Sequence, residues 1–181
     1  MSRLGFKFIR HFYELKLDLN NIRLPDFEPS GYIIRSLEPD ETDKLTLIQN
    51  RAFADSWGFN PNTPAEIEYR INLSTCSPEN IMMAYLKNRP IGYCWTRIMM
   101  EKKPAAGGMK GEIHMLGVDP DFRKKGIGRN VLLAGLADLK SRGATIVELT
   151  ADGEDPAALS LYKSVGFQVC SRSDWFEKTL A

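Results

Sequence analysis

Apolar residues recur along the chain with two different periods, and each change of period marks a change of predicted element. Spacings of three and four residues, typical of an amphipathic helix, begin at four places. The predicted helices cover residues 45 to about 57, 64–73, 127–143 and 156–165. The second has the clearest start, because Thr63 is followed by a proline at the first helical position and by Glu66 three residues later, which makes a capping box.

Runs of β-branched and aromatic residues between these helices predict strands. They cover residues 32–36, 81–86, 91–99, 112–118 and 144–150, and a final pair covers 167–172 and 175–179. A turn at residues 87–90 separates two of the runs, so residues 81–99 are expected to form an antiparallel hairpin. After residue 111, strands and helices alternate up to the final strand pair.

Length and composition are those of one folded domain. The chain has 181 residues, 43% of them hydrophobic and 26% charged, which suits a full hydrophobic core and no disordered or fibrous class. The formal net charge is +1, so no overall field attracts nucleic acid or an anionic membrane. Apolar runs are far shorter than the roughly 18 residues of a membrane span, and residues 1–24 lack a secretory apolar core, so a cytoplasmic protein is expected. Cys76, Cys94 and Cys170 suit neither a disulfide framework nor a zinc site, and no metal is predicted.

One loop carries the most chemical information. Pro120 stops the strand 112–118, and Gly126 and Gly128 allow tight backbone turns where the next helix begins. Free amides at a helix start bind anions such as phosphate, together with the helix dipole. The cations around this point are Arg123, Lys124, Lys125 and Arg129. The spacing fits neither the Walker pattern nor Gly-x-Gly-x-x-Gly, which disfavours ATP and NAD; the plain alternative is a charged surface turn.

The same loop resembles the acetyl-CoA loop of the GNAT superfamily of N-acetyltransferases, Arg/Gln-x-x-Gly-x-Gly/Ala, which reads here Arg123-Lys124-Lys125-Gly126-Ile127-Gly128. Segments 112–120 and 158–167 resemble the same superfamily, and all three stand in the family's order. The resemblance implies an α/β (α+β) GNAT fold over residues 31–181, with a mixed, mostly antiparallel sheet flanked by about four helices. In that fold the parallel strands that contain Glu112 and Ala144 splay apart and admit pantetheine.

Acetyl-CoA is the co-substrate that the resemblance implies. Its expected contacts are Leu116, Gly117, Val118, Arg123, Lys124, Lys125, Gly126, Ile127, Gly128, Arg129, Asp155 and Ala158. Backbone groups near Leu116 and Val118 would bond to pantetheine. Asp155 departs from the family, which often has asparagine there; it is a good helix N-cap but places a negative charge near the cofactor.

Acetyl transfer to a primary amine needs a base and an acid, because the amine is mostly protonated at neutral pH and a thiolate leaves. Glu112 and His114 lie two residues apart on a strand, face the same side and are both candidates for the base. The resemblance places Glu112 at a family base position. Tyr162 is the candidate acid, since a phenol is protonated at pH 7 and the family places this hydroxyl beside the thioester. The structural alternatives are a half-buried aromatic for Tyr162, a solvated charge for Glu112 and an inward-facing imidazole for His114.

The first 20 residues resemble the C-terminal segment of the same chain. Residues 4–10 and 12–17 repeat the pattern of 165–169 and 175–177, and both look like endings of a GNAT domain. We therefore predict an N-terminal strand pair and linker over residues 1–30, the remnant of a preceding GNAT domain as in tandem proteins that resemble mycothiol synthase. An isolated hairpin is unstable, so it should pair with the main sheet or, in a homodimer, with another copy of the chain.

Three functions fit these residues. The first is acetyl-CoA-dependent transfer of an acetyl group to a primary amine by direct attack in a ternary complex, with a small molecule, a peptide or a protein as acceptor. The second is an acyl-CoA-binding regulator without catalysis, which the presence of Tyr162 and Glu112 disfavours. The third is a nucleic-acid module, and the chain lacks the basic and aromatic surface repeat that such a module needs.

Overall fold

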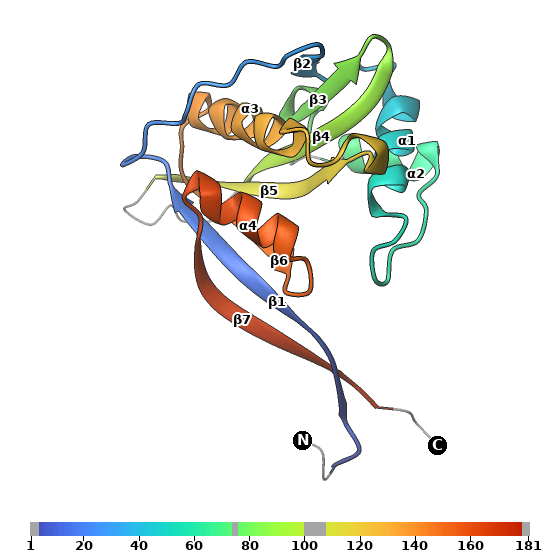
Figure 1. Cartoon of the computed structure of the whole chain (residues 1–181), viewed down its shortest axis with the longest axis vertical. Coiled ribbons are helices and arrows are strands. Elements are labelled where there is room, and N and C mark those ends of the chain that lie inside the picture. The colour runs from blue at the N-terminus through green and yellow to red at the C-terminus, as the bar shows by residue number, and fades with distance from the viewer. Residues whose placement is uncertain (1–3, 74–75, 100–107, 179–181) are drawn as a thin grey trace.

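The strands that the structure describes form one sheet with the order β2-β3-β4-β5-β6-β1-β7 (Figure 1). The structure is a computed structural model, and it describes residues 4–73, 76–99 and 108–178. The strands are β1 (Lys7–Asp18), β2 (Ile33–Ser36), β3 (Ile81–Leu86), β4 (Arg89–Met99), β5 (Met109–Val118), β6 (Ala144–Asp152) and β7 (Gln168–Glu177). β5 and β6 pair in parallel and the other neighbours are antiparallel, so the sheet is mixed and mostly antiparallel, as predicted.

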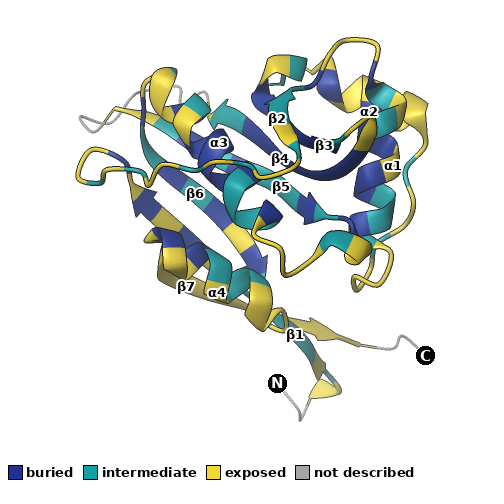
Figure 2. Ribbon diagram, turned by 45° about the horizontal axis from the view of Figure 1, so that its top comes forward, coloured by how far each residue is buried: buried dark blue, intermediate teal, exposed yellow. Residues whose placement is uncertain are grey.

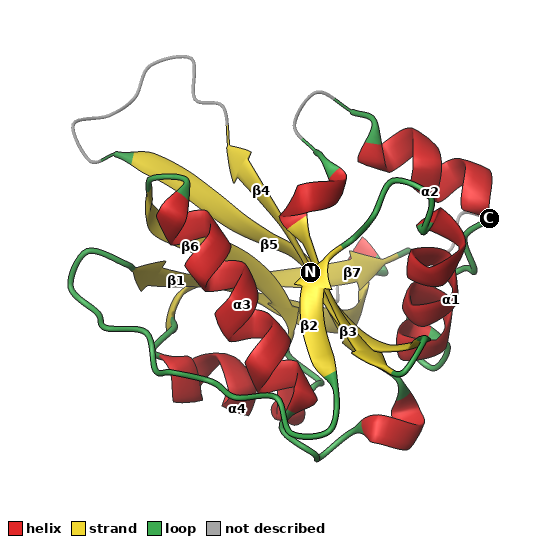
Figure 3. Cartoon of the chain, turned by 90° about the horizontal axis from the view of Figure 1, so that it is seen from above, coloured by secondary structure: helices red, strands yellow, loops and turns green. Residues whose placement is uncertain are grey.

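Helices lie on both faces of this sheet (Figure 3). Those described are α1 (Thr42–Phe53), α2 (Pro64–Ile71), α3 (Ile127–Ser141) and α4 (Pro156–Val165), with short 3-10 helices η2 (Pro78–Asn80) and η3 (Pro120–Phe122). Apolar residues of α1 and α2 pack against β3 and β4 around Trp95. Those of α3 and α4 form a second core around Leu132 and Leu136. The predicted α/β fold, a mixed sheet flanked by about four helices, is confirmed.

The helix starts follow from the caps in the sequence. Thr63 accepts a hydrogen bond from the amide of Glu66, and the Glu66 side chain accepts one from the amide of Thr63, so the predicted capping box of α2 is confirmed. Asp155 caps α4 by accepting a hydrogen bond from the amide of Ala158 at 2.9 Å. Gly166 ends α4 with φ of +109°, a left-handed conformation that favours glycine.

Each end of the chain forms one strand where the sequence predicts two. β1 runs unbroken over the expected N-terminal strand pair, and β7 runs unbroken over most of the expected final pair. Backbone pairing continues where the sequence predicts a break: His11 is opposite Asp174, and Phe12 is opposite Ser173. The two strands lie side by side, so each supplies the backbone partners that keep the other unbroken.

β1 belongs to the main sheet. It lies between β6 and β7 and is antiparallel to both. Leu15 is 0% exposed and Leu17 is 2% exposed, and both lie in the core that α3 and α4 cover. The segment therefore pairs within the chain along its whole described length. Its origin as a remnant of a preceding domain, with a boundary at residue 30, stays a prediction.

Candidate functional site

The sheet opens between β5 and β6. Their parallel ladder ends where Glu112 lies opposite Glu148. Beyond that point β5 continues to Val118 paired with β4, and β6 continues paired with β1. The backbone of β5 at Leu116 and Val118 therefore borders the place where the two strands part, as the predicted splay requires.

The loop after β5 leads into a helix start that no side chain caps. Gly126 is the N-cap residue of α3, and its φ of +79° lies in the left-handed region that favours glycine. The first amide bonded within the helix is that of Asn130, which donates to the carbonyl of Gly126, so the amides of Ile127, Gly128 and Arg129 have no partner within the helix. A Cβ built on Gly126 would meet no atom within 4 Å, so the turn is open on its outer side. Three converging amides and the helix dipole fit a phosphate group.

The cations predicted for this loop differ in how they are held. Arg123 donates to a carbonyl at the end of α1 at 2.8 Å and to the carbonyl of Val118 at 3.4 Å. Lys125 donates to a carbonyl within the loop at 3.3 Å, and Arg129 donates to a serine hydroxyl of α4 at 2.9 Å. Lys124 has φ of +62°, and its side chain makes no hydrogen bond or ion pair with another described residue. Of these four cations, only Lys124 has a charge without a bonded partner among the described residues. Arg123 links the loop to α1 through its hydrogen bond.

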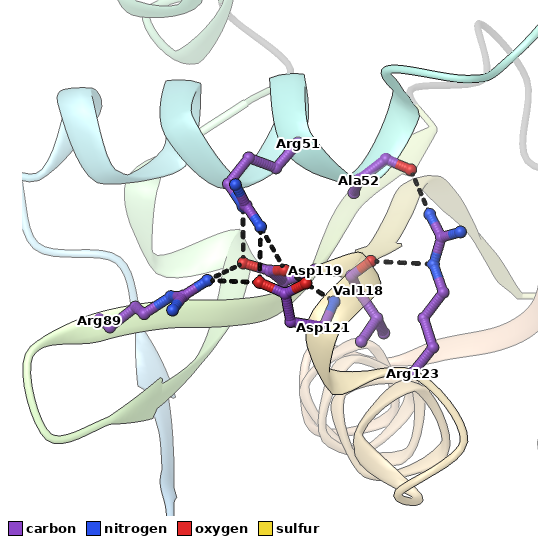
Figure 4. A network of polar contacts seen from close by, with 7 residues as sticks. All are labelled: Arg51, Ala52, Arg89, Val118, Asp119, Asp121 and Arg123. Atoms are coloured by element: carbon purple, nitrogen blue, oxygen red, sulfur yellow. Dashed lines mark hydrogen bonds and ion pairs between the residues drawn. The ribbon is translucent and has the colours of Figure 1, made fainter.

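An ion-pair network around one buried carboxylate fixes the start of the same loop (Figure 4). The carboxylate of Asp119, 0% exposed, accepts two hydrogen bonds from Arg51 at 2.8 and 2.9 Å and one from Arg89 at 2.9 Å. Both arginines also reach Asp121, and the amide of Asp121 donates to Asp119 at 3.0 Å. The hydrogen bonds from Arg51 outweigh burial and lower the pKa of Asp119 to about 2. The network joins α1, the start of β4 and the loop before α3.

Sequence reasoning missed this network. Arg51 is 68 residues from Asp119 and Arg89 is 30 residues from it, so no local spacing connects them. The one available signal was the dipeptide Asp119-Pro120, which is typical of a turn start; here Asp119 caps η3.

Tyr162 projects from α4 into the core that α3 and α4 cover. It is 8% exposed and meets Phe167 edge to face, with the ring centroids 5.8 Å apart. Its hydroxyl makes no hydrogen bond to any described residue. Burial raises the pKa of Tyr162 well above that of a free phenol, so this hydroxyl stays protonated throughout the neutral range.

Glu112 already has a strong partner. Arg97, opposite it on β4, donates to both of its carboxylate oxygens at 2.6 and 3.1 Å. A bidentate guanidinium fixes the orientation of the carboxylate. Glu112 is therefore positioned at the opening but held as an ion pair.

His114 occupies a bulge in β5. Trp95 is opposite Met115 and Thr96 is opposite Ile113, which leaves His114 as the extra residue. Its ring meets the Trp95 ring edge to face at 5.4 Å, and its Nδ1 lies 4.0 Å from the Glu112 carboxylate. Burial, with the charge of Arg97 as a smaller cause, lowers the pKa of His114 below its usual value near 6.5. The imidazole is therefore neutral at pH 7 and able to accept a proton.

The other predicted contacts have structural roles of their own. A Cβ on Gly117 would lie 2.7 Å from Ala52 and 2.7 Å from Tyr93, so glycine is needed there for α1 to pack against β5. The amide of Ala158 is bonded to Asp155. The structure thus brings the end of β5, the start of α3 and α4 together: a Cβ on Gly128 would lie 3.4 Å from Val118 and 3.5 Å from Leu161. Asp155 and Ala158 lie at the start of α4, and Tyr162 lies on the same helix.

An aromatic contact spans from the loop after α1 to the far strand of the sheet. Trp57 meets Trp175 of β7 edge to face at 6.3 Å, and Arg10 of β1 lies over the Trp57 ring at 5.3 Å. Phe12 meets Trp175 on the same side, with centroids 5.2 Å apart. Trp175 was not predicted to lie near this loop, because no spacing in the sequence relates it to Trp57.

The described residues contain neither a membrane-spanning helix nor a cluster of metal ligands. No described helix is both long and apolar enough to cross a membrane. No three histidine, cysteine, aspartate or glutamate side chains in the described ranges gather closely enough to hold a metal ion.

Comparison with known proteins agrees with the fold and the loop. Residues 43–167 match the model of the Acetyltransferase (GNAT) family. The chain is 36% identical over 140 residues to a mycothiol acetyltransferase of Thermobispora bispora, covering 77% of this chain and 47% of that protein. It is 32% identical over 166 residues to a mycothiol acetyltransferase of Thermomonospora curvata, covering 90% of this chain and 53% of that protein. The chain spans about half the length of the curated relatives it matches.

Solved structures share the fold. A GCN5-related N-acetyltransferase from Sphaerobacter thermophilus superposes with a TM-score of 0.77 at 23% identity, over 97% of this chain and 53% of that one. An aminoglycoside acetyltransferase from an uncultured soil metagenomic sample superposes with a TM-score of 0.66 at 19% identity, over 83% of this chain and 97% of that one. With the family model covering more than half of the sequence and the sheet opening beside an uncapped, glycine-turned helix start, the chain belongs to the GNAT family of acetyltransferases.

Proposed function

We propose that this chain transfers an acetyl group from acetyl-CoA to a primary amine of a small molecule, with both substrates bound at once. The observation that carries the proposal is the uncapped start of α3 at Gly126, next to the point where β5 and β6 part. The family uses acetyl-CoA, and the amides of Ile127, Gly128 and Arg129 fit its diphosphate. Lys124 adds a charge beside them.

The residues of the chain have separate roles in this proposal. Acetyl-CoA supplies the thioester. The backbone at Leu116 and Val118, on the free side of β5, orients the pantetheine arm as a further strand would. Tyr162 donates its proton, or a hydrogen bond, to the departing sulfur, because its hydroxyl is protonated and has no partner among the described residues.

His114 is the proposed base. Glu112 faces the same opening, but its carboxylate is paired with Arg97, whereas the imidazole of His114 is neutral and not bonded to a cation. Glu112 lies 4.0 Å from His114 and stabilises the imidazolium that forms when the proton is taken from the amine. In this arrangement Glu112 is a positioning residue.

The acceptor is proposed from the relatives. Those named mycothiol acetyltransferase match most of this chain, so a small-molecule amine is favoured over a peptide or a protein. Trp57 and Phe12 lie with Trp175 on the face of the sheet that α1 and α2 occupy, where an acceptor could approach His114.

The proposal is tested in two steps. Acetyl-CoA is titrated into the protein in a calorimeter, and CoA release is then followed with a thiol reagent in the presence of primary amines of different size and polarity. Binding followed by amine-dependent CoA release is the expected result. Absence of binding would sink the proposal, and binding without turnover on any amine would favour the acyl-CoA-binding regulator instead.

A further inference from the structure

β7 is an open edge of the sheet. It is the last strand in the described order, it pairs with β1 on one side, and all ten of its residues are exposed (Figure 2). Three large apolar side chains lie along it: Val169, Trp175 and Phe176, exposed by 42%, 53% and 37%. An exposed strand of this length presents a row of unpaired backbone amides and carbonyls, which is a template for pairing with another strand.

The charges on this edge are arranged symmetrically about one residue. Arg172 and Asp174 lie two positions apart, so their side chains share a face, and they form an ion pair at 2.6 Å. Ser173 lies between them, and the register with β1 is regular from Ser171 to Trp175. If a second β7 pairs antiparallel with Ser173 opposite its own copy, each Arg172 lies opposite an Asp174 of the other chain.

We propose that the partner of this edge is a second copy of the same chain, paired antiparallel about Ser173. The two-fold axis stands perpendicular to the sheet, so both sheets join into one and α4 of both copies lies on the same side. Four charges then alternate around the axis, and each has two neighbours of opposite sign. Such a network stabilises more than a single exposed ion pair, which contributes about 0–1 kcal/mol. The interface is isologous, as most two-subunit interfaces are.

The same register pairs the remaining side chains without conflict. Within the regular part of the strand, Trp175 lies opposite Ser171 of the other copy, so the large aromatic side chain faces a small residue. No like charges are opposed between Ser171 and Trp175. A peptide of unrelated sequence would not meet this two-fold pattern, which favours a second copy. The inference does not depend on the proposed function.

Cysteine scanning tests the register. In a C170S background, S173C places the two introduced thiols on the axis, where Cα atoms of directly opposite residues lie about 4.5–5.5 Å apart and a disulfide fits. S171C is the matched control, because its two copies lie about 14 Å apart, four residues along the strand. Mild oxidation is expected to cross-link S173C and not S171C. Equal cross-linking of both, or of neither, overturns the register.

Charge reversal tests the interface without introduced cysteines. R172D sets carboxylates opposite each other, and D174R sets guanidinium groups opposite each other, so each is expected to raise the dimer dissociation constant at least tenfold in sedimentation equilibrium. R172D/D174R exchanges the two charges and is expected to restore the dimer. A wild-type chain that stays monomeric at about 100 μM overturns the proposal, because that concentration populates dimers with dissociation constants up to the same order. So does a dimer that neither single reversal weakens.

Discussion

The polar side chains of the candidate site differ in whether they already have a hydrogen-bond or ion-pair partner within the protein. Arg123, Arg129 and Glu112 are each committed to a neighbour, while Lys124 and the hydroxyl of Tyr162 have no bonded partner among the described residues. A polar group that is bonded within the protein stabilises the fold, whereas one without such a partner is available to a ligand.

Tyr162→Phe removes the proposed proton donor and keeps the ring. We expect kcat to fall by about 10- to 100-fold, because general acid catalysis is lost, with little change in the affinity for acetyl-CoA. Steady-state kinetics and calorimetry measure the two quantities. Tyr13→Phe on β1 makes the same chemical change away from the opening and is expected to leave kcat unchanged. Full activity in Tyr162→Phe would contradict the acid role.

His114→Asn removes the proposed base. We expect kcat/KM to fall by about 100-fold and the acid limb of its pH profile to disappear. In the native chain that limb lies below pH 6.5, because the pKa of His114 is lowered and activity is lost as the imidazole becomes protonated. Glu112→Gln is the comparison and is expected to keep an acid limb. The reverse pattern would assign the base to Glu112.

Asp119→Asn removes the charge at the centre of the network in Figure 4. We expect the free energy of unfolding at pH 7 to fall by about 2 kcal/mol, since a folded pKa of about 2 lies below the unfolded value near 3.9. That stabilisation is present above about pH 4 and is lost as the pH falls toward 2. Denaturant melts of both proteins at pH 7 and pH 2 should therefore converge in acid. Asp26→Asn, at an exposed position, is the control and should leave the free energy of unfolding unchanged at both pH values.

The glycine loop and the neighbouring strands could be predicted from the sequence, because each lies in a local pattern whose spacing has a physical meaning. The role of Tyr162 was predicted from the resemblance to the GNAT superfamily. The pairing of Glu112 with Arg97 and of Asp119 with Arg51 could not. Those contacts join residues that are 15 and 68 positions apart, and the register of β4 with β5 decides which side chains meet. The choice between Glu112 and His114 stayed open for that reason.

At the scale of elements, the helices were predictable where caps are encoded in the chain. Thr63 and Glu66 form the box that the sequence predicts, and Gly166 ends α4. Strand limits were harder to predict. A polar residue ends a strand if it would lose its backbone partner or be buried without a polar contact. His11 and Asp174 keep their backbone partners because they lie opposite each other, and the largely buried His11 side chain lies 3.4 Å from the carboxylate of Glu154.

Gly126→Ala tests the turn before α3. A side chain at φ of +79° costs roughly 1–2 kcal/mol, and we expect the affinity for acetyl-CoA to fall at least tenfold because the amides at the helix start shift. Gly58→Ala is a matched control: its φ is +70°, and a Cβ there also meets nothing within 4 Å. It should lower stability by a similar amount and leave the affinity unchanged. Equal loss of affinity in both variants would remove the turn from the cofactor site.

At the scale of the molecule, one core extends from the first strand to the last helix. Leu15, Leu17 and Leu19 of the N-terminal segment are buried with Leu132 of α3 and Val165 of α4. Whatever the origin of residues 1–30, β1 contributes to the stability of the whole sheet.

Leu17→Ala tests this statement. We expect the free energy of unfolding to fall by about 3 kcal/mol, as for other large-to-small changes in a core, with a single transition for the whole chain. Leu4→Ala is the control, since Leu4 precedes the same strand but is 66% exposed, and it should change stability by less than about 0.5 kcal/mol. Chemical denaturation followed by tryptophan fluorescence and by circular dichroism gives both values. A separate early transition in Leu17→Ala would mean that β1 folds independently.

The position of β1 sets an order of events during folding. β1 precedes β6 and β7 in the sequence but lies between them in the sheet, so Asp18 reaches its opposite residue, Ile146, only by closing a loop of roughly 130 residues. The hairpin β3–β4 needs no such closure and can form first, and until β1 docks its leucines stay exposed to solvent and prone to misassociation. Docking of β1 should therefore be slow compared with the folding of the central strands.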